Sequence, residues 1–371
     1  MEKNSKEPIR VLHVLQRMEA AGVQTLLMNL YRSIDRSKVQ FDFLVHYKEH
    51  QFFDDEIEAL GGKIYRLSVR EDYNFIKYCK ELDTFFEEHP EYKVVHGHMH
   101  SLGAIYLHYA KKHGVPVRIA HSHTNSTQND AKKFIKQIMN SLYRKDATDL
   151  FSCSEAAGKY MFGDGDFTVI NNAILTDNFL FSQAKRDEKR KELGVENKFV
   201  IGNVGRFELQ KNQKFLVDVF SVLHEMIPES KLLLIGTGSM LEEVKKKVNE
   251  MGLNSAVSFL GNRKDVAELY MAMDVFVFPS LFEGLGIVGV EAQAAGTPCV
   301  CTDTLPKEIS VTPLLYRLPL KNGVDDWAKK IVEAKDNSYA HNNMKQYIVD
   351  ANYDMTTLAK QLEEFYLARA D

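Results

Sequence analysis

A glycine-containing turn between two glutamates is the segment best suited to chemistry in this sequence. Residues 274–291, DVFVFPSLFEGLGIVGVE, contain an apolar run that predicts a buried strand, then the turn, then a helix. Backbone N–H groups at such a turn face out of the carboxyl edge of a sheet, where the positive end of the helix dipole stabilises a phosphate. The residues concerned are Gly284, Leu285, Gly286 and Ile287.

The two glutamates, Glu283 and Glu291, suit hydroxyl groups rather than phosphates. An ionised carboxylate only accepts hydrogen bonds, so it binds sugar hydroxyls and repels phosphate. We therefore expect Glu283 to contact a transferred sugar and Glu291 to contact a ribose. A bare pair of glutamates at this spacing would favour a simpler interpretation, namely a turn glutamate and an exposed helical one.

The surrounding pattern decides between these interpretations. Residues 279–298, PSLFEGLGIVGVEAQAAGTP, resemble the signature of retaining glycosyltransferases of family four, with strand, glycines, both glutamates and the trailing AxGxP in register. The resemblance implies the GT-B fold, in which two Rossmann-like domains face each other across a cleft. It also implies a nucleotide diphosphate sugar as donor.

A second element places two cations on one loop. Residues 203–212, NVGRFELQKN, are similar to the family's G-R-x(4)-K-N element and contain Arg206 and Lys211. Two fixed cations would hold the diphosphate and stabilise the charge that grows on the leaving phosphate. They would replace a divalent ion, so we predict no metal and no other cofactor. The alternative is a solvated basic loop.

Two further loops resemble the family's nucleotide pocket. Residues 235–239, IGTGS, place Gly238 after a strand, although the loop alone would be a generic glycine turn. Residues 259–262, FLGN, lead from Asn262 into Arg263 and resemble the loop that meets the nucleobase, largely through main-chain groups. Because the side chains of this loop say little about which base is bound, UDP is favoured as a prior and not deduced from the residues.

The first half of the chain carries a weaker signal. Residues 17–24, RMEAAGVQ, stand where the family commonly has a GG turn, but Ala21 replaces the first glycine and only Gly22 remains. Gly22 still allows a close backbone contact to the ligand. No GxGxxG follows this strand, which argues against a dinucleotide enzyme.

Histidines gather at two expected strand ends. They are His96, His98 and His100, then His121 and His123. Alternating spacing places neighbours on one strand face, and no cysteine or carboxylate pattern accompanies them, so a zinc site is disfavoured. HSHTN, residues 121–125, resembles the family position where a histidine touches the transferred sugar. We choose His123 over His121 because it lies further towards the loop; a packed core histidine is the alternative for both.

The elements that must position these residues form two α/β series. Short β-branched and aromatic runs alternate with helical segments, as in parallel sheets covered on both faces. We predict one domain over residues 1–178, with the final helix, 355–371, packing back on it, and a second domain over 179–354. Expected strands are 9–15, 41–46, 63–67, 93–98, 117–121, 149–153 and 168–171, then 199–204, 231–235, 257–260, 274–278 and 298–301.

Composition bounds the partners and the compartment. The chain has 371 residues and a formal net charge of −4, so it lacks the basic footprint of a nucleic-acid binder. No run of 18 apolar residues and no signal-peptide core occur, so we expect a cytoplasmic protein. If the acceptor is lipid-linked, the basic residues 131–145 would contact the inner face of the membrane. Most such stripes are simply solvated faces.

Taken together, the residues and the resemblance predict a retaining, metal-independent glycosyltransferase. It would move a hexose from a nucleotide diphosphate, with UDP favoured, to a hydroxyl of a glycan or lipid-linked saccharide in cell-surface or exopolysaccharide synthesis. Two alternatives stay open: a non-catalytic GT-B subunit that binds nucleotide or glycan, and a sugar-nucleotide epimerase of the same fold.

Overall fold

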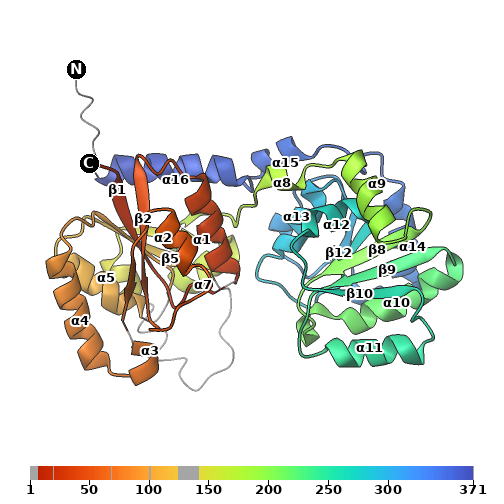
Figure 1. Cartoon of the computed structure of the whole chain (residues 1–371), viewed down its shortest axis with the longest axis horizontal. Helices are drawn as coiled ribbons and strands as arrows, with labels where there is room; N and C mark the ends of the chain where they lie inside the picture. Colours follow the sequence, from red (N-terminus) through yellow and green to blue (C-terminus); the bar gives the residue numbers. More distant parts are fainter. Residues whose placement is uncertain (1–6, 20, 68, 100–101, 124–141, 371) are drawn as a thin grey trace. The chain divides into compact units, whose positions relative to one another are not determined.

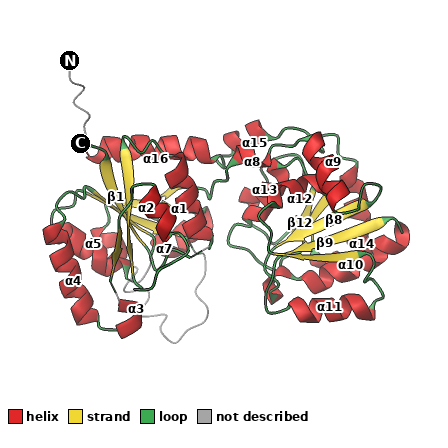
Figure 2. Ribbon diagram, viewed as in Figure 1, coloured by secondary structure: helices red, strands yellow, loops and turns green. Residues whose placement is uncertain are grey.

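The chain folds into two compact units. The computed structural model describes residues 7–19, 21–67, 69–99, 102–123 and 142–370 (Figure 1). One unit comprises Met1–Ile174 and Asp354–Asp371, and the other comprises Leu175–Tyr353. Each consists of a parallel sheet with helices packed on it (Figure 2).

Within the described residues, the first unit contains a seven-stranded parallel sheet in the order β3-β2-β1-β4-β5-β6-β7. Its central strands bury many apolar residues, as parallel strands covered by helices do; in β1, Val11, Leu12 and Val14 are all fully buried. The bounds are β1 (Ile9–Val14), β2 (Val39–Val45), β3 (Ile64–Arg66), β4 (Val94–Gly97), β5 (Val117–Ser122), β6 (Asp149–Ser152) and β7 (Thr168–Val169).

Helices cover both faces of this sheet. On one face Leu12 packs with Tyr78 and Leu107, from two helices that follow β3 and β4. The bounds are α1 (Gly22–Ser33), α2 (Asp54–Ala59), α3 (Val69–Asp72), α4 (Phe75–Glu88), α5 (Gly103–Lys112), α7 (Glu155–Phe162) and α16 (Met355–Ala370).

The C-terminal helix belongs to the first unit, as the sequence predicts. α16 packs against α1, β1 and β2 on the other face of the sheet (Figure 1). Tyr366 of α16 is fully buried, lies edge-on to Phe41 of β2, and is hydrogen-bonded to His96 of β4 at 2.7 Å. The last turns of the chain therefore complete the core of a domain formed by its first half.

The second unit has the same architecture with six parallel strands among the described residues. The order is β10-β9-β8-β11-β12-β13, so the direction of strand addition reverses between β8 and β11. Ligands bind at such a switch point in open α/β sheets, outside the carboxyl ends of the strands. The bounds are β8 (Phe199–Val204), β9 (Ser230–Ile235), β10 (Val257–Gly261), β11 (Val275–Phe278), β12 (Cys299–Thr302) and β13 (Leu315–Leu318).

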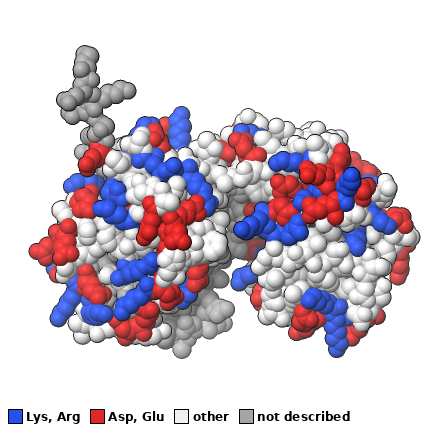
Figure 3. Space-filling view, in the orientation of Figure 1, with Lys and Arg blue, Asp and Glu red and all other residues white. Residues whose placement is uncertain are grey.

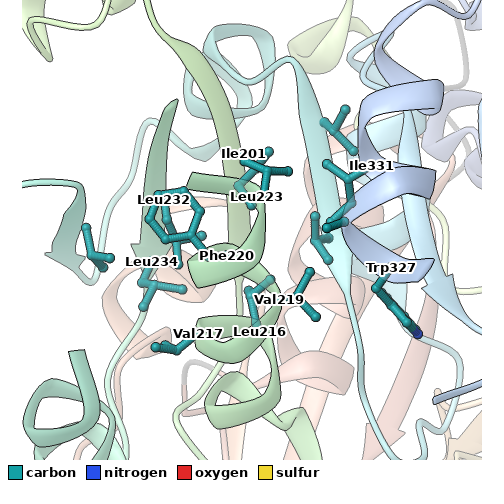
Figure 4. Packing of buried hydrophobic residues seen from close by; sticks show 14 of the residues in the cluster. Ile201, Leu216, Val217, Val219, Phe220, Leu223, Leu232, Leu234, Trp327 and Ile331 are labelled. Carbon is teal, nitrogen blue, oxygen red and sulfur yellow. The ribbon is translucent and has the colours of Figure 1, made fainter. Parts of the chain in front are cut away.

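The core of the second unit lies between its sheet and two long helices. Phe220 and Leu223 of α10 pack with Trp327 and Ile331 of α14 against the strand residue Ile201 (Figure 4). The helix bounds are α8 (Thr176–Phe179), α9 (Gln183–Glu192), α10 (Gln213–Met226), α11 (Leu241–Glu250), α12 (Val266–Ala272), α13 (Ile287–Ala294), α14 (Gly323–Lys335) and α15 (Lys345–Asp350), with 3₁₀ turns at Leu209–Lys211, Lys307–Ile309 and Leu320–Asn322.

Two findings bear on the expected partners. On the face shown in Figure 3, basic and acidic side chains are interspersed over both units. Among the described helices, none has both the length and the apolar character needed to cross a bilayer. Most of the basic segment at 131–145, expected to meet a membrane, lies outside the described residues.

Candidate active site

Three loops of the second unit, those after β8, β9 and β11, meet at the carboxyl edge of its sheet. The loops after β8 and β11 flank the switch point and are tied together by two hydrogen bonds: Leu281 N–H donates to Gln210 O at 2.8 Å, and the Asn212 amide donates to Pro279 O at 3.2 Å. On the β9 side, Phe207 N–H donates to Thr237 O at 2.9 Å. Residues far apart in the sequence are thus fixed around one point.

Lys211 and Glu283 meet across the switch point. Lys211 Nζ lies 2.6 Å from Glu283 Oε1, and their side chains are only 15% and 7% exposed. Gln210 Nε2 lies 3.4 Å from the other carboxylate oxygen. An ammonium has three donors, so this pair still leaves Lys211 able to bind phosphate oxygens, while Glu283 is held in a fixed position.

Arg206 belongs to the same edge but is exposed. Its backbone is fixed, because Gln213 Nε2 donates to Arg206 O at 3.0 Å. Arg206 is therefore an exposed residue on an anchored loop, five residues before Lys211.

Helix α13 begins beside this pair. Its N-cap is Gly286, with φ 88° and ψ 48°, and no side chain caps the helix. The first-turn N–H groups of a helix lack intrahelical partners and attract anions. A Cβ at Gly286 would lie 3.0 Å from Phe278 Cε1, so both the backbone angle and the space favour glycine. This arrangement places backbone donors where the sequence predicts a phosphate.

Glu291 lies one turn into α13. It is hydrogen-bonded to Tyr270, a residue that the sequence motifs do not indicate. The Tyr270 hydroxyl of α12 donates to Glu291 Oε2 at 3.1 Å. Burial raises the pKa of Glu291 to about 6, and the Tyr270 hydrogen bond acts in the opposite direction. No sequence signal links these residues, because their contact arises from the packing of α12 against α13.

The nucleotide-side residues fall into two groups. Gly238 packs closely on the loop after β8: a Cβ there would lie 2.5 Å from Phe207 O, so only glycine fits. Asn262 is near Thr237, with 3.4 Å between side-chain oxygens. The Arg263 guanidinium instead forms ion pairs with Asp265 at 2.6 Å and Glu192 at 3.0 Å, which raise its pKa. Its charge is therefore directed to α9.

The remaining candidates lie in the first unit. Gly22 is the exposed first residue of α1, and a Cβ on it would meet no atom within 4 Å. His121 is 2% exposed at the end of β5, whereas His123, two residues beyond, is half-buried, with Nε2 2.9 Å from His98 Nδ1. His100 lies outside the described residues. The structure thus brings Arg206, Lys211, Glu283 and the α13 start together in one unit, and the histidines together in the other.

Comparison with known proteins identifies the family. The sequence model for "Glycosyl transferases group 1" matches residues 185–365. EpsF of Bacillus subtilis, provisionally named a glycosyltransferase, is 34% identical over 335 residues, which cover 88% of this chain and 87% of EpsF. The chain belongs to the group 1 glycosyl transferases.

A second relative and a solved structure are also similar to this chain. The Escherichia coli UDP-Gal:alpha-D-GlcNAc-diphosphoundecaprenol alpha-1,3-galactosyltransferase is 26% identical over 81% of each chain. The crystal structure of Anabaena Alr3699/HepE in complex with UDP superposes with a TM-score of 0.80, covering 97% of this chain and all of that one at 18% identity. The fold is therefore GT-B, and this group 1 member is a glycosyltransferase.

Proposed function

We propose that this protein is a retaining, metal-independent glycosyltransferase of family four. The observation that carries the proposal is the Lys211–Glu283 pair, held at 2.6 Å on the switch point beside the start of α13. A cation and a set of free backbone donors there suit a diphosphate, and a carboxylate at the same point suits the sugar attached to it.

In the proposed complex, Lys211, Arg206 and the first N–H groups of α13 hold the donor diphosphate. The bond from the sugar anomeric carbon to the phosphate oxygen breaks, so negative charge grows on the leaving diphosphate. Fixed cations and amides that stabilise this charge act as a divalent ion would. No metal is then needed at the diphosphate.

Glu283 binds hydroxyls of the transferred sugar, and Glu291 binds the ribose. With Lys211 beside it, Glu283 is placed to orient the sugar rather than to form a covalent bond with it. We therefore assign a front-face substitution: the acceptor oxygen attacks the anomeric carbon on the side that the phosphate leaves. The acceptor proton passes to a phosphate oxygen, and the anomeric configuration is retained. The contact of His123 with the transferred sugar, which the family resemblance implies, stays a prediction.

The names of the relatives support a proposal for the substrates. We infer a UDP-sugar donor, because the galactosyltransferase relative uses UDP-Gal and the HepE structure contains UDP. We infer as acceptor a hydroxyl of a glycan or lipid-linked saccharide, because that relative acts on a diphosphoundecaprenol-linked sugar and another is a capsular polysaccharide enzyme of Staphylococcus aureus. The cell compartment that fits such cytosolic donors is the cytoplasm, with peripheral contact to the membrane where the acceptor is lipid-linked.

The test is turnover of the full chain with a panel of UDP-, GDP- and ADP-sugars, followed as release of the nucleoside diphosphate. Lys211→Ala and Glu283→Ala should each lower turnover at least about tenfold, or roughly 1.4 kcal/mol of transition-state stabilisation. A transferase also requires the acceptor for net conversion, whereas an epimerase would change the donor sugar alone.

Lys214→Ala is the matched control, because Lys214 lies in the adjacent first turn of α10 but pairs with exposed Glu243. It should keep near-normal turnover. Near-normal rates in both Lys211→Ala and Glu283→Ala would refute the assignment.

A further inference from the structure

Five imidazole rings converge at the carboxyl edge of the first unit's sheet. His13 of β1 is in register with His96 of β4, and His98 follows two residues later on the same face. His121 at the end of β5 and His123 beyond it continue the row. The strand order places β1 beside β4, so the cluster lies at the switch point of this sheet, the region where open α/β sheets bind ligands.

Two of these rings are fixed through one nitrogen by a second imidazole. His98 Nε2 lies 3.0 Å from His13 Nδ1, and His121 Nδ1 lies 3.1 Å from His96 Nε2. His96 is fixed in turn by the Tyr366 hydroxyl at 2.7 Å. Metal-ligating histidines characteristically have their second ring nitrogen engaged in this way, which sets the tautomer and the orientation of the ring.

The other nitrogens of these rings face one another. His98 Nδ1 and His123 Nε2 are 2.9 Å apart. His121 Nε2 is buried and has no hydrogen-bond partner among the described residues. One ring nitrogen from each of His98, His121 and His123 lies within 4.8 Å of the other two. Three imidazole nitrogens thus converge, and one of them is a buried polar atom that an ion would satisfy.

We propose that His98, His121 and His123 bind one divalent transition-metal ion of the class Zn²⁺, Co²⁺ and Ni²⁺. Two ligands on a tetrahedral ion with metal–nitrogen distances near 2.0–2.1 Å stand roughly 3.3 Å apart. The His98–His123 pair therefore needs to open by only a few tenths of an ångström. Three protein ligands leave a fourth position for water or a substrate oxygen.

The chemistry of the pocket selects this class of ion. Imidazole suits zinc, cobalt and nickel, whereas magnesium and calcium require oxygen ligands. Burial lowers the pKa values of His98 and His121 well below their ordinary range, so the rings are neutral and keep a lone pair for the ion. His98 and His123 are half-buried, which gives an ion a route from solvent to the buried His121.

Sequence spacing alone disfavours zinc here, because it shows no mixed cysteine or carboxylate pattern. The structure adds what spacing cannot show: β4 and β5 are neighbours, and His13 and His96 support the rings from behind. The proposed ion is separate from the proposed diphosphate site, because Arg206, Lys211 and the start of α13 all belong to the second unit.

The test is a titration of the tag-free, EDTA-stripped full chain with Co²⁺, followed by the visible absorption of the ion. We expect one equivalent to bind with the intense bands of a four-coordinate site, and Zn²⁺ to displace it. His98→Gln and His123→Gln should each weaken binding at least about tenfold. His50→Gln, a substitution at an exposed histidine paired with Asp55, should leave binding unchanged.

Two outcomes would overturn the proposed metal site. Wild-type protein that shows no such bands, and no rise in melting temperature with Zn²⁺, would mean that the rings form only a hydrogen-bonded relay. Binding that is intact in His123→Gln but lost in His98→Gln would place the ion on His13, His96 and His98 instead and overturn the assignment. The Co²⁺ spectrum and the Zn²⁺ melting shift are measured on the wild-type protein, so they test the proposal even if a variant fails to fold.

Discussion

The Glu291 carboxyl group is subject to two opposing effects. Burial favours its neutral form and raises its pKa to about 6 from an ordinary value of 4.5, while the Tyr270 hydroxyl at 3.1 Å favours the ionised form. An ionised carboxylate accepts stronger hydrogen bonds from ribose hydroxyls than a neutral acid does. The contribution of Glu291 to donor affinity therefore depends on whether its carboxyl group is ionised, which changes near pH 6.

We predict that donor affinity rises between pH 5 and pH 7 with a midpoint near 6, because the raised pKa keeps Glu291 protonated below that value. The phosphates of a nucleotide sugar stay ionised across this range, so the change reports the protein. Calorimetric binding of the donor at several pH values measures it. Glu291→Gln cannot titrate and should remove this step; a wild-type profile without the step would contradict the role of Glu291.

Tyr270→Phe separates positioning from simple packing. Losing one hydrogen bond to a carboxylate costs about 1.5–3 kcal/mol and removes an effect that lowers the pKa of Glu291. We expect a higher KM for the donor with little change in kcat, and a midpoint that moves above pH 6. A higher KM for the donor without a shift in the pH midpoint would mean that Tyr270 contributes only to packing.

At the scale of single residues, the sequence predicts those candidate site residues that lie within short, continuous motifs. The motifs point to Lys211 and Glu283, and the structure brings these two together across 72 positions. Tyr270 could not be found, because helix packing alone brings it to Glu291. Arg263 differs from Lys211 and Glu283. We expect it near the nucleotide from its loop motif, but its guanidinium is ion-paired with Glu192 and Asp265, which lie outside that motif.

At the scale of elements, the start of α13 depends on the backbone of one glycine. Gly286 has φ 88° and a Cβ there would approach Phe278, whereas a Cβ at the neighbouring Gly284 would meet nothing within 4 Å. Left-handed backbone costs a non-glycine residue roughly 1–2 kcal/mol. The two glycines of one turn thus carry different constraints.

Gly286→Ala should accordingly destabilise the second unit by about 1–2 kcal/mol. Gly284→Ala, the matched control, should leave stability nearly unchanged. Trp327 is the single tryptophan of the chain and is fully buried in the second unit, so denaturant unfolding followed by its fluorescence reports on this unit. Equal midpoints for the two variants would show that the turn does not need the left-handed conformation.

Most strands could be predicted from periodicity, and the exception has a physical reason. β8 has the predicted bounds, and the bounds of most other strands differ from the prediction by only one or two residues. β13 was missed because its four residues, LYRL, are only half-buried and carry an arginine, so they lack the apolar run of a central strand. At the start of the second unit, α9 is held in place by Arg186, whose guanidinium donates to Asp274 at 2.5 Å.

On the scale of the whole molecule, both sheets repeat one design. Each has a switch point between the first strand of the series and the fourth, and each gathers its candidate chemistry there: cations and helix donors in one unit, imidazoles in the other. Sequence motifs predict the first of these sites because its residues lie in two short segments. The second site escapes prediction because its support comes from His13 and from Tyr366, at opposite ends of the chain.

The central claim is that the second unit grips a diphosphate without a divalent cation. The most direct test is calorimetric titration of the full chain with UDP, GDP and ADP in excess EDTA, repeated with added Mg²⁺ or Mn²⁺. We predict that one nucleotide binds in EDTA, that metal changes its Kd by less than about twofold, and that Lys211→Ala weakens it at least about tenfold. Binding that disappears in EDTA and returns with Mg²⁺ or Mn²⁺ would contradict the account.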